Sequence, residues 1–501
     1  MTSTAAPRET RLAERVDLVT GSGPGRSLRR GSLRFLRTAA LPVGVQGPTA
    51  GVLIGPAIIA GIVGRPGALA QVIGLVAMGF VAYAFVTFTR SFNTAGSVYA
   101  FNGAALGPGY GFVSAWLLLL VYLSFAAGVY ASTADIGQTL LASLGLHVGW
   151  LWLGLAGAVL ALILALTSIG FSSLVILVCE GASILLITAV AIAVLAGGGY
   201  HHHGLTAAPF SPHGVPAGLL ALGVTAVFGQ FSGFESASAL GEEAHRSTRT
   251  IPAAITWSLI GSAAVYIFFT WIVYSAYPSP AAVAASPAPL VHIAGVYLGP
   301  DMAIAVNAAG LISAFGAQLA CLNAAARLLY ALGRETGGPG KLATRLWARH
   351  GSPVGALAIA GAVSIAGLAA FGFEASATRA ATLIIQYGAY LILAAYLLTV
   401  LAAVAWTWRT RRRPVPLAIL AAGAAVLGYI VYRTFIPFPA APFGRVVLAG
   451  AASAGVGAAL LLIPGLRGRL RGSPLLAVTT TAGMPAGRAT APAPPGPGSG
   501  A

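Results

Sequence analysis

Apolar runs about 20 residues long follow one another along most of the chain, and they constrain its fold more than any other feature. A helix of about 20 apolar residues is long enough to cross about 30 Å of hydrocarbon. Because hydrocarbon offers no hydrogen-bond partners, the backbone of such a segment must be paired within the protein. The runs therefore predict an all-α, polytopic membrane bundle.

The composition indicates the same class. Of the 501 residues, 57% are hydrophobic and 8% are charged, whereas an ordinary soluble domain has about 25% charged residues. The runs predict a single bundle of twelve transmembrane helices rather than several domains. These spans lie near residues 41–64, 68–88, 110–133, 149–169, 172–196, 215–238, 253–276, 301–329, 353–371, 380–404, 415–435 and 445–464.

Polar tails flank the expected twelve-helix domain, residues 39–464. Residues 1–38 contain eight arginines and no apolar run long enough for a signal-peptide core. Residues 465–501 are rich in Ala, Pro, Gly, Ser and Thr, and they lack the apolar content to fold. We expect both tails to be largely disordered.

The net charge of +17 indicates membrane topology rather than a nucleic-acid-binding face, because the basic residues lie between the apolar runs. With twelve spans, both termini lie on one side of the membrane, and 24 of the 28 basic residues fall on that side. The positive-inside rule then predicts that both tails are cytoplasmic and that the protein is multi-pass in the cytoplasmic membrane. The four basic residues on the other side are Arg65, Arg379, Arg433 and Arg445.

Spans one and six are each interrupted by a G-x-x-x-G sequence in mid-span. Span one reads GPTAG at 47–51, and span six reads GQFSG at 229–233. This motif is often a helix-packing face, but glycine-interrupted backbone at membrane depth is tolerated mainly where it lines a cavity. The residues that favour unwinding here are Pro48 and the polar Gln46, Thr49, Gln230 and Ser232.

The two interruptions lie five spans apart, which is the spacing expected of an inverted repeat. We therefore expect residues 41–196 and 215–404 to be two repeats of five helices (5+5), with residues 415–464 adding helices eleven and twelve. In such transporters, half-helix N-termini face an anionic group and freed carbonyls face a cation. A zwitterion such as an amino acid satisfies both.

Two carboxylates lie in mid-span, Glu180 in span five and Glu235 directly after the break of span six. A carboxylate at the membrane centre costs on the order of 2.5 to 3.5 kcal/mol on insertion scales, so such groups usually face the bundle interior and have a role. We expect coupling or gating roles for both. The alternative is a protonated glutamate that is hydrogen-bonded to a backbone carbonyl as a structural clamp.

Three ordered stretches carry a resemblance to a known family. GFESASALGEEAHRSTRTIPAAI at 233–255 resembles the span-six signature of the amino acid, polyamine and organocation permease superfamily. AGSVYAFNGAALGPGYGFVSAW at 95–116 resembles its entry to span three, and RLLYALGRETGGPGKLATRLWARHGSPVGAL at 327–357 resembles its loop after span eight. The resemblance implies a secondary amino acid transporter with the leucine-transporter-type fold and broken helices 1 and 6.

The resemblance also implies where the substrate binds. The N–H groups of Thr49, Ala50 and Gly51 align with the family's G-S-G and are expected to receive the substrate carboxylate. The freed backbone around Gly233 is expected to receive the ammonium, and Gln46 with Phe231 is expected to read the side chain. The carbonyls expected for the ammonium are those near Phe228, Gly229 and Ser232. With no mid-span Asp or Lys dedicated to a charged side chain, a neutral substrate is favoured.

Two other classes of protein are alternatives to a transporter. An intramembrane enzyme would need paired catalytic groups at one depth, and the spans hold no mid-span histidine or lysine. A non-transporting sensor on the same scaffold stays open. Consecutive histidines in a hydrated loop seldom form a closed metal site, so neither a metal nor a cofactor is expected. The loop histidines are His201, His202, His203 and His213.

The sequence leaves open which ion is coupled to transport. Some proton-coupled relatives place a lysine in span five where sodium-coupled ones hold an ion, and this sequence has no lysine there. Proton symport is favoured over exchange, and sodium coupling stays an alternative. The expected partners are a small amino acid or amine substrate, membrane lipid and protons; the oligomeric state is open.

Overall fold

A computed structural model describes residue 28 and residues 31–92, 94–143, 145–202, 204–337, 341–347, 351–410 and 413–472. Within these residues the secondary structure is helical apart from two isolated β-bridges. The twelve expected spans are occupied by α2 (Phe35–Gln46) with α3 (Pro48–Val63), α4 (Gly67–Thr89), α6 (Pro108–Ser143), α7 (Trp150–Ala165), α8 (Ile169–Ala196), α9 (Ala217–Phe231) with η3 (Phe234–Leu240), α10 (Ser247–Ser275), α13 (Pro300–Thr336), α14 (Val354–Ala369), α15 (Ala377–Thr410), α16 (Pro414–Phe435) and α17 (Phe443–Leu460).

The predicted all-α polytopic bundle is confirmed. Ten segments of the described chain are long and apolar enough to cross a membrane, counting α2 with α3 and α9 with η3 as one each. Helices α7 and α14 occupy the other two expected positions and have 16 residues each. In contrast, α6 and α13 run well beyond the lengths expected for them, to 36 and 37 residues.

Short helices fill the connections between the spans. They are α5 (Val98–Leu106), η1 (Tyr200–His202), η2 (Ala208–Phe210), α11 (Pro280–Ala285) and α12 (Pro289–Leu298). A further helix, α18 (Pro464–Arg471), occupies the start of the predicted C-terminal tail, and α2 begins inside the predicted N-terminal tail. Both segments find partners on the bundle that the linear sequence does not reveal.

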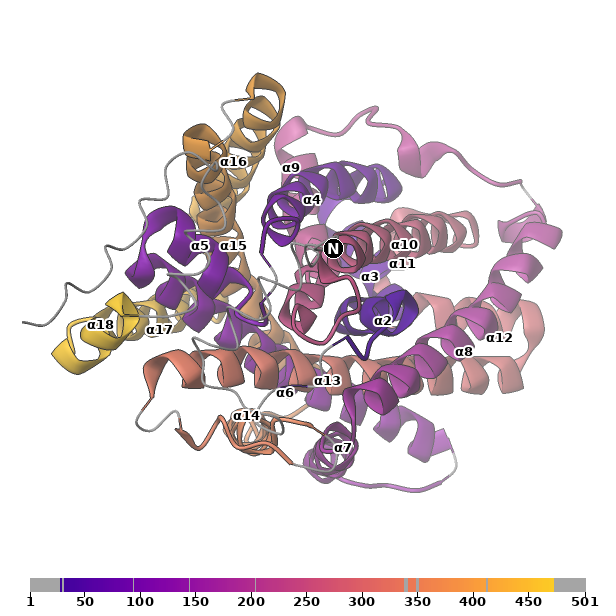
Figure 1. Cartoon of the computed structure of the whole chain (residues 1–501). Helices are drawn as coiled ribbons and strands as arrows, with labels where there is room; N and C mark the ends of the chain where they lie inside the picture. Colours follow the sequence, from indigo (N-terminus) through magenta and orange to yellow (C-terminus); the bar gives the residue numbers. More distant parts are fainter. Residues whose placement is uncertain are drawn as a thin grey trace, which may run out of the picture.

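The packing of the helices relates the two halves (Figure 1). Helix α6 packs along α15, and its counterpart five spans later, α13, packs along α8. The pair α6 and α7 corresponds in the same way to α13 and α14, and the pair α2 and α10 corresponds to α9 and α4. These recurring pairs are the arrangement that the 5+5 repeat predicts.

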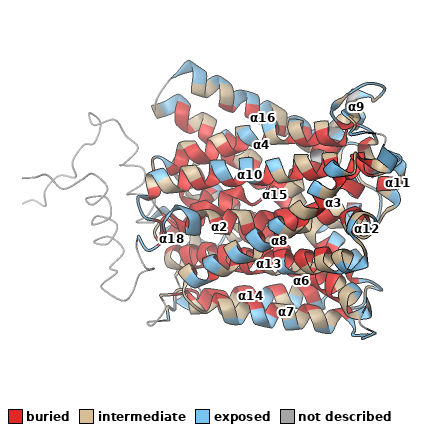
Figure 2. Ribbon diagram, turned by 90° about the vertical axis from the view of Figure 1, so that its right-hand side faces the viewer, coloured by how far each residue is buried: buried red, intermediate tan, exposed pale blue. Residues whose placement is uncertain are grey.

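Helices α16 and α17 lie at the periphery of the bundle. They pack on α15, α4 and α6, and few of their residues are buried. Buried residues concentrate on the inner helices instead (Figure 2). The outer surface keeps large apolar side chains such as Trp152, Leu185 and Leu448 exposed, as lipid contact requires.

Two ends of the bundle are distinguished below. The tail side is the end at which Leu33, Glu243 and Arg469 lie, and the loop side is the end at which Tyr200, Tyr277 and His292 lie.

Candidate functional site

The break in span one lies at Gly47. Helix α2 ends at Gln46, Gly47 has a left-handed φ of 52°, and α3 begins at Pro48. Proline suits this first helical position because its missing N–H would have no helical partner there. The predicted break is confirmed but is narrower than the GPTAG motif suggests, because residues 48–51 already form the first turn of α3.

The break in span six is wider. Helix α9 ends at Phe231, Ser232 is extended, and Gly233 has a φ of 114°. A Cβ atom on Gly233 would lie 2.5 Å from the Val45 Cγ1 atom. The two breaks therefore meet inside the bundle, and both the backbone angle and the close approach require glycine at this point.

Gln46 ties the two breaks together and to α10. Its Nε2 donates to the Phe231 carbonyl at 3.1 Å, while its Oε1 accepts from Ser262 Oγ at 2.9 Å. The Tyr266 hydroxyl donates to the Gln46 carbonyl at 2.6 Å. The Gln46 amide, expected to read the substrate side chain, is thus engaged in satisfying the carbonyl at the end of α9.

A second amide pair extends this network to span two. Gln71 Nε2 donates to Gln230 Oε1 at 2.9 Å, and Gln230 Nε2 reaches the Gly51 carbonyl at 3.4 Å. Gln71, Ser262 and Tyr266 were not predicted as site residues. They could have been found from the sequence as polar residues inside apolar runs, because such groups need hydrogen-bond partners in hydrocarbon.

The N-terminus of α3, expected to receive a substrate carboxylate, is filled by the protein's own groups. The Gly51 N–H donates to the Gly47 carbonyl at 2.9 Å. The Ala50 N–H donates to Ser313 Oγ at 3.1 Å, and that hydroxyl donates to Glu180 Oε1 at 2.8 Å. The Thr49 backbone faces the same Glu180 carboxylate. A carboxylate at a helix N-terminus is favourable, and here it comes from span five.

Glu180 is only half satisfied in this arrangement. Its Oε2 atom and the Thr49 Oγ1 atom are both buried without a hydrogen-bond partner among the described residues. An unpaired carboxylate oxygen inside a bundle costs free energy unless it carries a proton or meets a cation. Glu180 therefore has one oxygen that is free to bind a proton or a cation.

Glu235 is fully engaged by comparison. Tyr122 of α6 donates to its Oε1 at 2.9 Å, and Tyr396 of α15 and the Gly233 N–H donate to its Oε2 at 2.5 and 2.9 Å. This carboxylate therefore joins spans three, six and ten at the break. The two tyrosines were not identified from the sequence, because nothing in the spacing of distant spans shows which side chains meet.

The remaining predicted site residues line the end of α9. Phe228 is buried with its ring 6.2 Å from that of Tyr396, and its carbonyl accepts from Ser232 Oγ at 2.9 Å. The Phe231 ring lies 5.6 Å from that of Tyr266. Gly229 differs, because a Cβ atom added to it would meet nothing within 4 Å. Open space therefore adjoins the break at Gly229.

Two ion pairs lie at the tail side of the bundle. Glu243 pairs with Arg327 at 2.6 Å, both side chains being 1% exposed, and Glu242 pairs with Arg334 at 2.5 Å. Arg327 also donates to Asn323. The loop after η3 is thereby fixed to α13. Leu33 adds a short bridge to Ala244 that brings the N-terminal segment onto the same loop.

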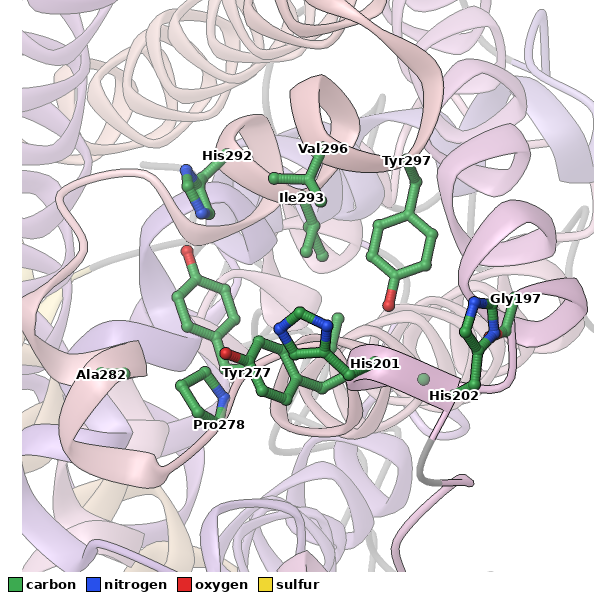
Figure 3. A pocket seen from close by; sticks show the side chains of 13 residues that line it. Gly197, His201, His202, Tyr277, Pro278, Ala282, His292, Ile293, Val296 and Tyr297 are labelled. Carbon is green, nitrogen blue, oxygen red and sulfur yellow. The ribbon is translucent and has the colours of Figure 1, made fainter.

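A cavity of about 600 Å³ lies at the loop side, between the end of α8 and helices α11 and α12 (Figure 3). Its walls include His201, His202 and His292 together with Tyr277 and Tyr297. Among the described residues, no group of three His, Cys, Asp or Glu side chains is placed to hold a metal ion; His203 lies outside them. This cavity is separate from the two breaks.

Comparison with known proteins gives the class. A family model described as amino acid permease matches residues 33–451. The chain is 28% identical over 334 residues to a branched-chain amino acid permease of Lactococcus lactis subsp. cremoris, which covers 61% of this chain and 69% of that protein. It is 26% identical over 362 residues to the low-affinity putrescine importer of Escherichia coli, covering 69% and 74%. A methylthioribose transporter of Bacillus subtilis is 26% identical over 318 residues, covering 60% and 64%.

The family match extends over most of the chain and contains both breaks. The chain therefore belongs to the amino acid permease family, as the sequence resemblance predicted. The relatives named above carry different small molecules, which agrees with a membrane transporter of amino acids or amines and points away from an enzyme.

Proposed function

We propose that the protein is a secondary transporter that moves a neutral amino acid across the cytoplasmic membrane by alternating access, with both termini in the cytoplasm. The observation that carries this proposal is the meeting of two broken helices inside the bundle, with open space beside them at Gly229. Broken helices at matching positions are where secondary transporters bind their substrates. The tail-side ion pairs then belong to a conformation that is closed toward the cytoplasm.

The proposed substrate site consists of the residues expected from the sequence, and each residue has a stated role. The substrate carboxylate binds the N-terminus of α3 at Thr49 and Ala50, and its ammonium group binds carbonyls at the end of α9. Gly229 supplies room for the side chain, against Phe228. Gln46 holds the two breaks in register, Gly51 leaves room for the Tyr266 ring, and Gly233 allows the close approach of Val45.

Glu180 supplies the proposed coupling. Its carboxylate occupies the same helix N-terminus that the substrate carboxylate needs, through Ser313 and the Thr49 backbone. Two negative charges at one helix end repel each other, so substrate binds when Glu180 takes up a proton. One proton then enters with each substrate, which makes the protein a proton symporter. Glu235 has the gating role, because it links α6, the break and α15.

The test of coupling is substrate-driven pH change in proteoliposomes. We expect substrate uptake by the parent protein to acidify the lumen, and the same result for Glu235→Gln if that variant folds. For Glu180→Gln we expect uptake without acidification. Glu374→Gln removes a carboxylate outside the site and is the matched control. If the parent moves no protons, or if Glu180→Gln still couples, Glu180 is not the proton carrier.

The substrate is identified by uptake of radiolabelled compounds into the same vesicles. Leucine, valine, putrescine and methylthioribose represent the relatives' named substrates, and we expect the neutral amino acids to be carried. Uptake of putrescine alone would favour the amine reading, in which the unpaired Glu180 Oε2 receives an ammonium group. Flux only against an internal amino acid would show an exchanger, sodium-dependent flux would show sodium coupling, and binding without flux would show a sensor.

A further inference from the structure

Helix α18 presents two different faces. Leu466 and Leu470 are four residues apart and therefore lie on one face; Leu470 is 2% exposed against the bundle, which α18 meets at α13 and α6. Arg467 and Arg471 are also four residues apart, and both are exposed. Two guanidinium groups one turn apart on one face form a site for a phosphate group.

Neither Arg467 nor Arg471 forms an ion pair with an acidic side chain in the described part of the chain. The residues directly before the helix are apolar and exposed, with Leu462 at 79% and Ile463 at 50%. Exposed apolar residues beside exposed arginines are the pattern of a helix that lies in the interface between hydrocarbon and lipid headgroups.

The third arginine of α18 connects this helix to span eight. Arg469 Nη1 donates to the Thr336 carbonyl at 2.7 Å, at the C-terminal end of α13. Two residues before that end, α13 carries Arg334, which pairs with Glu242 on the tail side. A cation at the end of a helix satisfies its last carbonyls and its dipole. Helix α18 is thus attached to the element that closes the tail side.

We propose that α18 is a binding site for anionic phospholipid, in which Arg467 and Arg471 hold the phosphate headgroup while Arg469 holds the end of α13. The source of the phosphate is the membrane leaflet, because Leu462 and Ile463 place the helix at its surface. Bound lipid fixes α18 and, through Arg469, stabilises the tail-closed arrangement of α13. The cytoplasmic leaflet as the source rests on the orientation given under the proposed function.

The experiment measures lipid binding directly on the purified full-length protein in detergent. Phosphatidylglycerol and phosphatidylcholine are titrated, and bound lipid is counted by native mass spectrometry while the thermal midpoint is followed. We expect phosphatidylglycerol to bind and to raise the midpoint. The variant R467Q/R471Q loses two cations near the lipid surface, each contributing on the order of 1 kcal/mol, so we expect its affinity to fall about 10-fold or more.

The control R379Q/R445Q removes the same charge from exposed loop-side arginines and is expected to bind phosphatidylglycerol like the parent. R469Q is expected to bind the lipid but to lose the rise in midpoint. Equal binding by R467Q/R471Q and the parent, or an equal fall in the control, would overturn the proposal. The same stabilisation by inorganic phosphate alone would overturn the lipid as its source. Because no step measures transport, failure here is distinct from failure of the proposed function.

Discussion

Two glycines of the span-six break differ in what they permit. Gly233 has a left-handed backbone and touches Val45, whereas Gly229 is helical and borders open space. A side chain at Gly233 meets both backbone strain and overlap, and a side chain at Gly229 meets neither. The same G-x-x-x-G motif thus combines a glycine that the backbone requires with one that borders open space.

We expect Gly233→Ala to destabilise the protein by about 2 to 4 kcal/mol, from backbone strain together with overpacking, and to abolish uptake. Gly229→Ala, the matched control, is expected to keep the parent's thermal midpoint in detergent. Gly229→Trp is expected to fold but to take up bulky amino acids at least several-fold more slowly than alanine. A destabilised Gly229→Ala, or an unaffected Gly233→Ala, would contradict this account.

Among the helices, α13 contributes both to the candidate site and to the ion pairs of the tail side. It supplies Ser313 to the N-terminus of α3, Arg327 and Arg334 to the tail-side ion pairs, and Thr336 to the contact with α18. Its extra length beyond a simple span is therefore explained by its contacts on the tail side. A movement of α13 relative to α2 and η3 would change the site and the closure together.

Removing one partner of the buried Arg327–Glu243 pair leaves the other charge uncompensated, which costs about 3 to 5 kcal/mol. We therefore expect Arg327→Met to lower the thermal midpoint strongly, and Arg327→Met combined with Glu243→Gln to recover much of it. Arg379→Met breaks an exposed pair with Glu374 and should cost at most about 1 kcal/mol. A double variant no more stable than Arg327→Met would show that the uncompensated charge of Glu243 does not cause the loss of stability.

For the whole molecule, the distribution of basic residues predicts the orientation, and the fold brings the corresponding segments to two ends. The N-terminal segment and the loop after η3 lie at one end, and η1 lies at the other. Figure 2 shows α18 at the first end and α11 and α12 at the second. This separation makes the orientation testable with one reagent.

Single cysteines at the exposed positions Leu205 and Leu342 should be labelled from opposite sides of the membrane. In intact cells, a membrane-impermeant thiol reagent is expected to label Leu205→Cys and to label Leu342→Cys only after lysis. The native Cys179 and Cys321 lie within helices α8 and α13, and a variant with both replaced by alanine is the background. Labelling of Leu342→Cys in intact cells would reverse the proposed orientation.

The amino-acid sequence was sufficient to predict the class, the approximate places of the spans and the two interruptions. Hydrocarbon imposes a minimum length and a pairing requirement on each segment, and both are properties of consecutive residues. For the same reason, Gly47 and Gly233 were recognisable as breaks, and the family was recognisable from motifs within single stretches.

Contacts between distant groups could not be predicted, because they depend on how the spans pack and not on spacing along the chain. The structure supplies them. It placed Glu180 on the N-terminus of α3 and gave Glu235 two tyrosines from other spans. It also showed that Gln46 links the two breaks through the Phe231 carbonyl. Two mid-span carboxylates that look alike in the sequence thus differ, because one has every oxygen paired and the other does not.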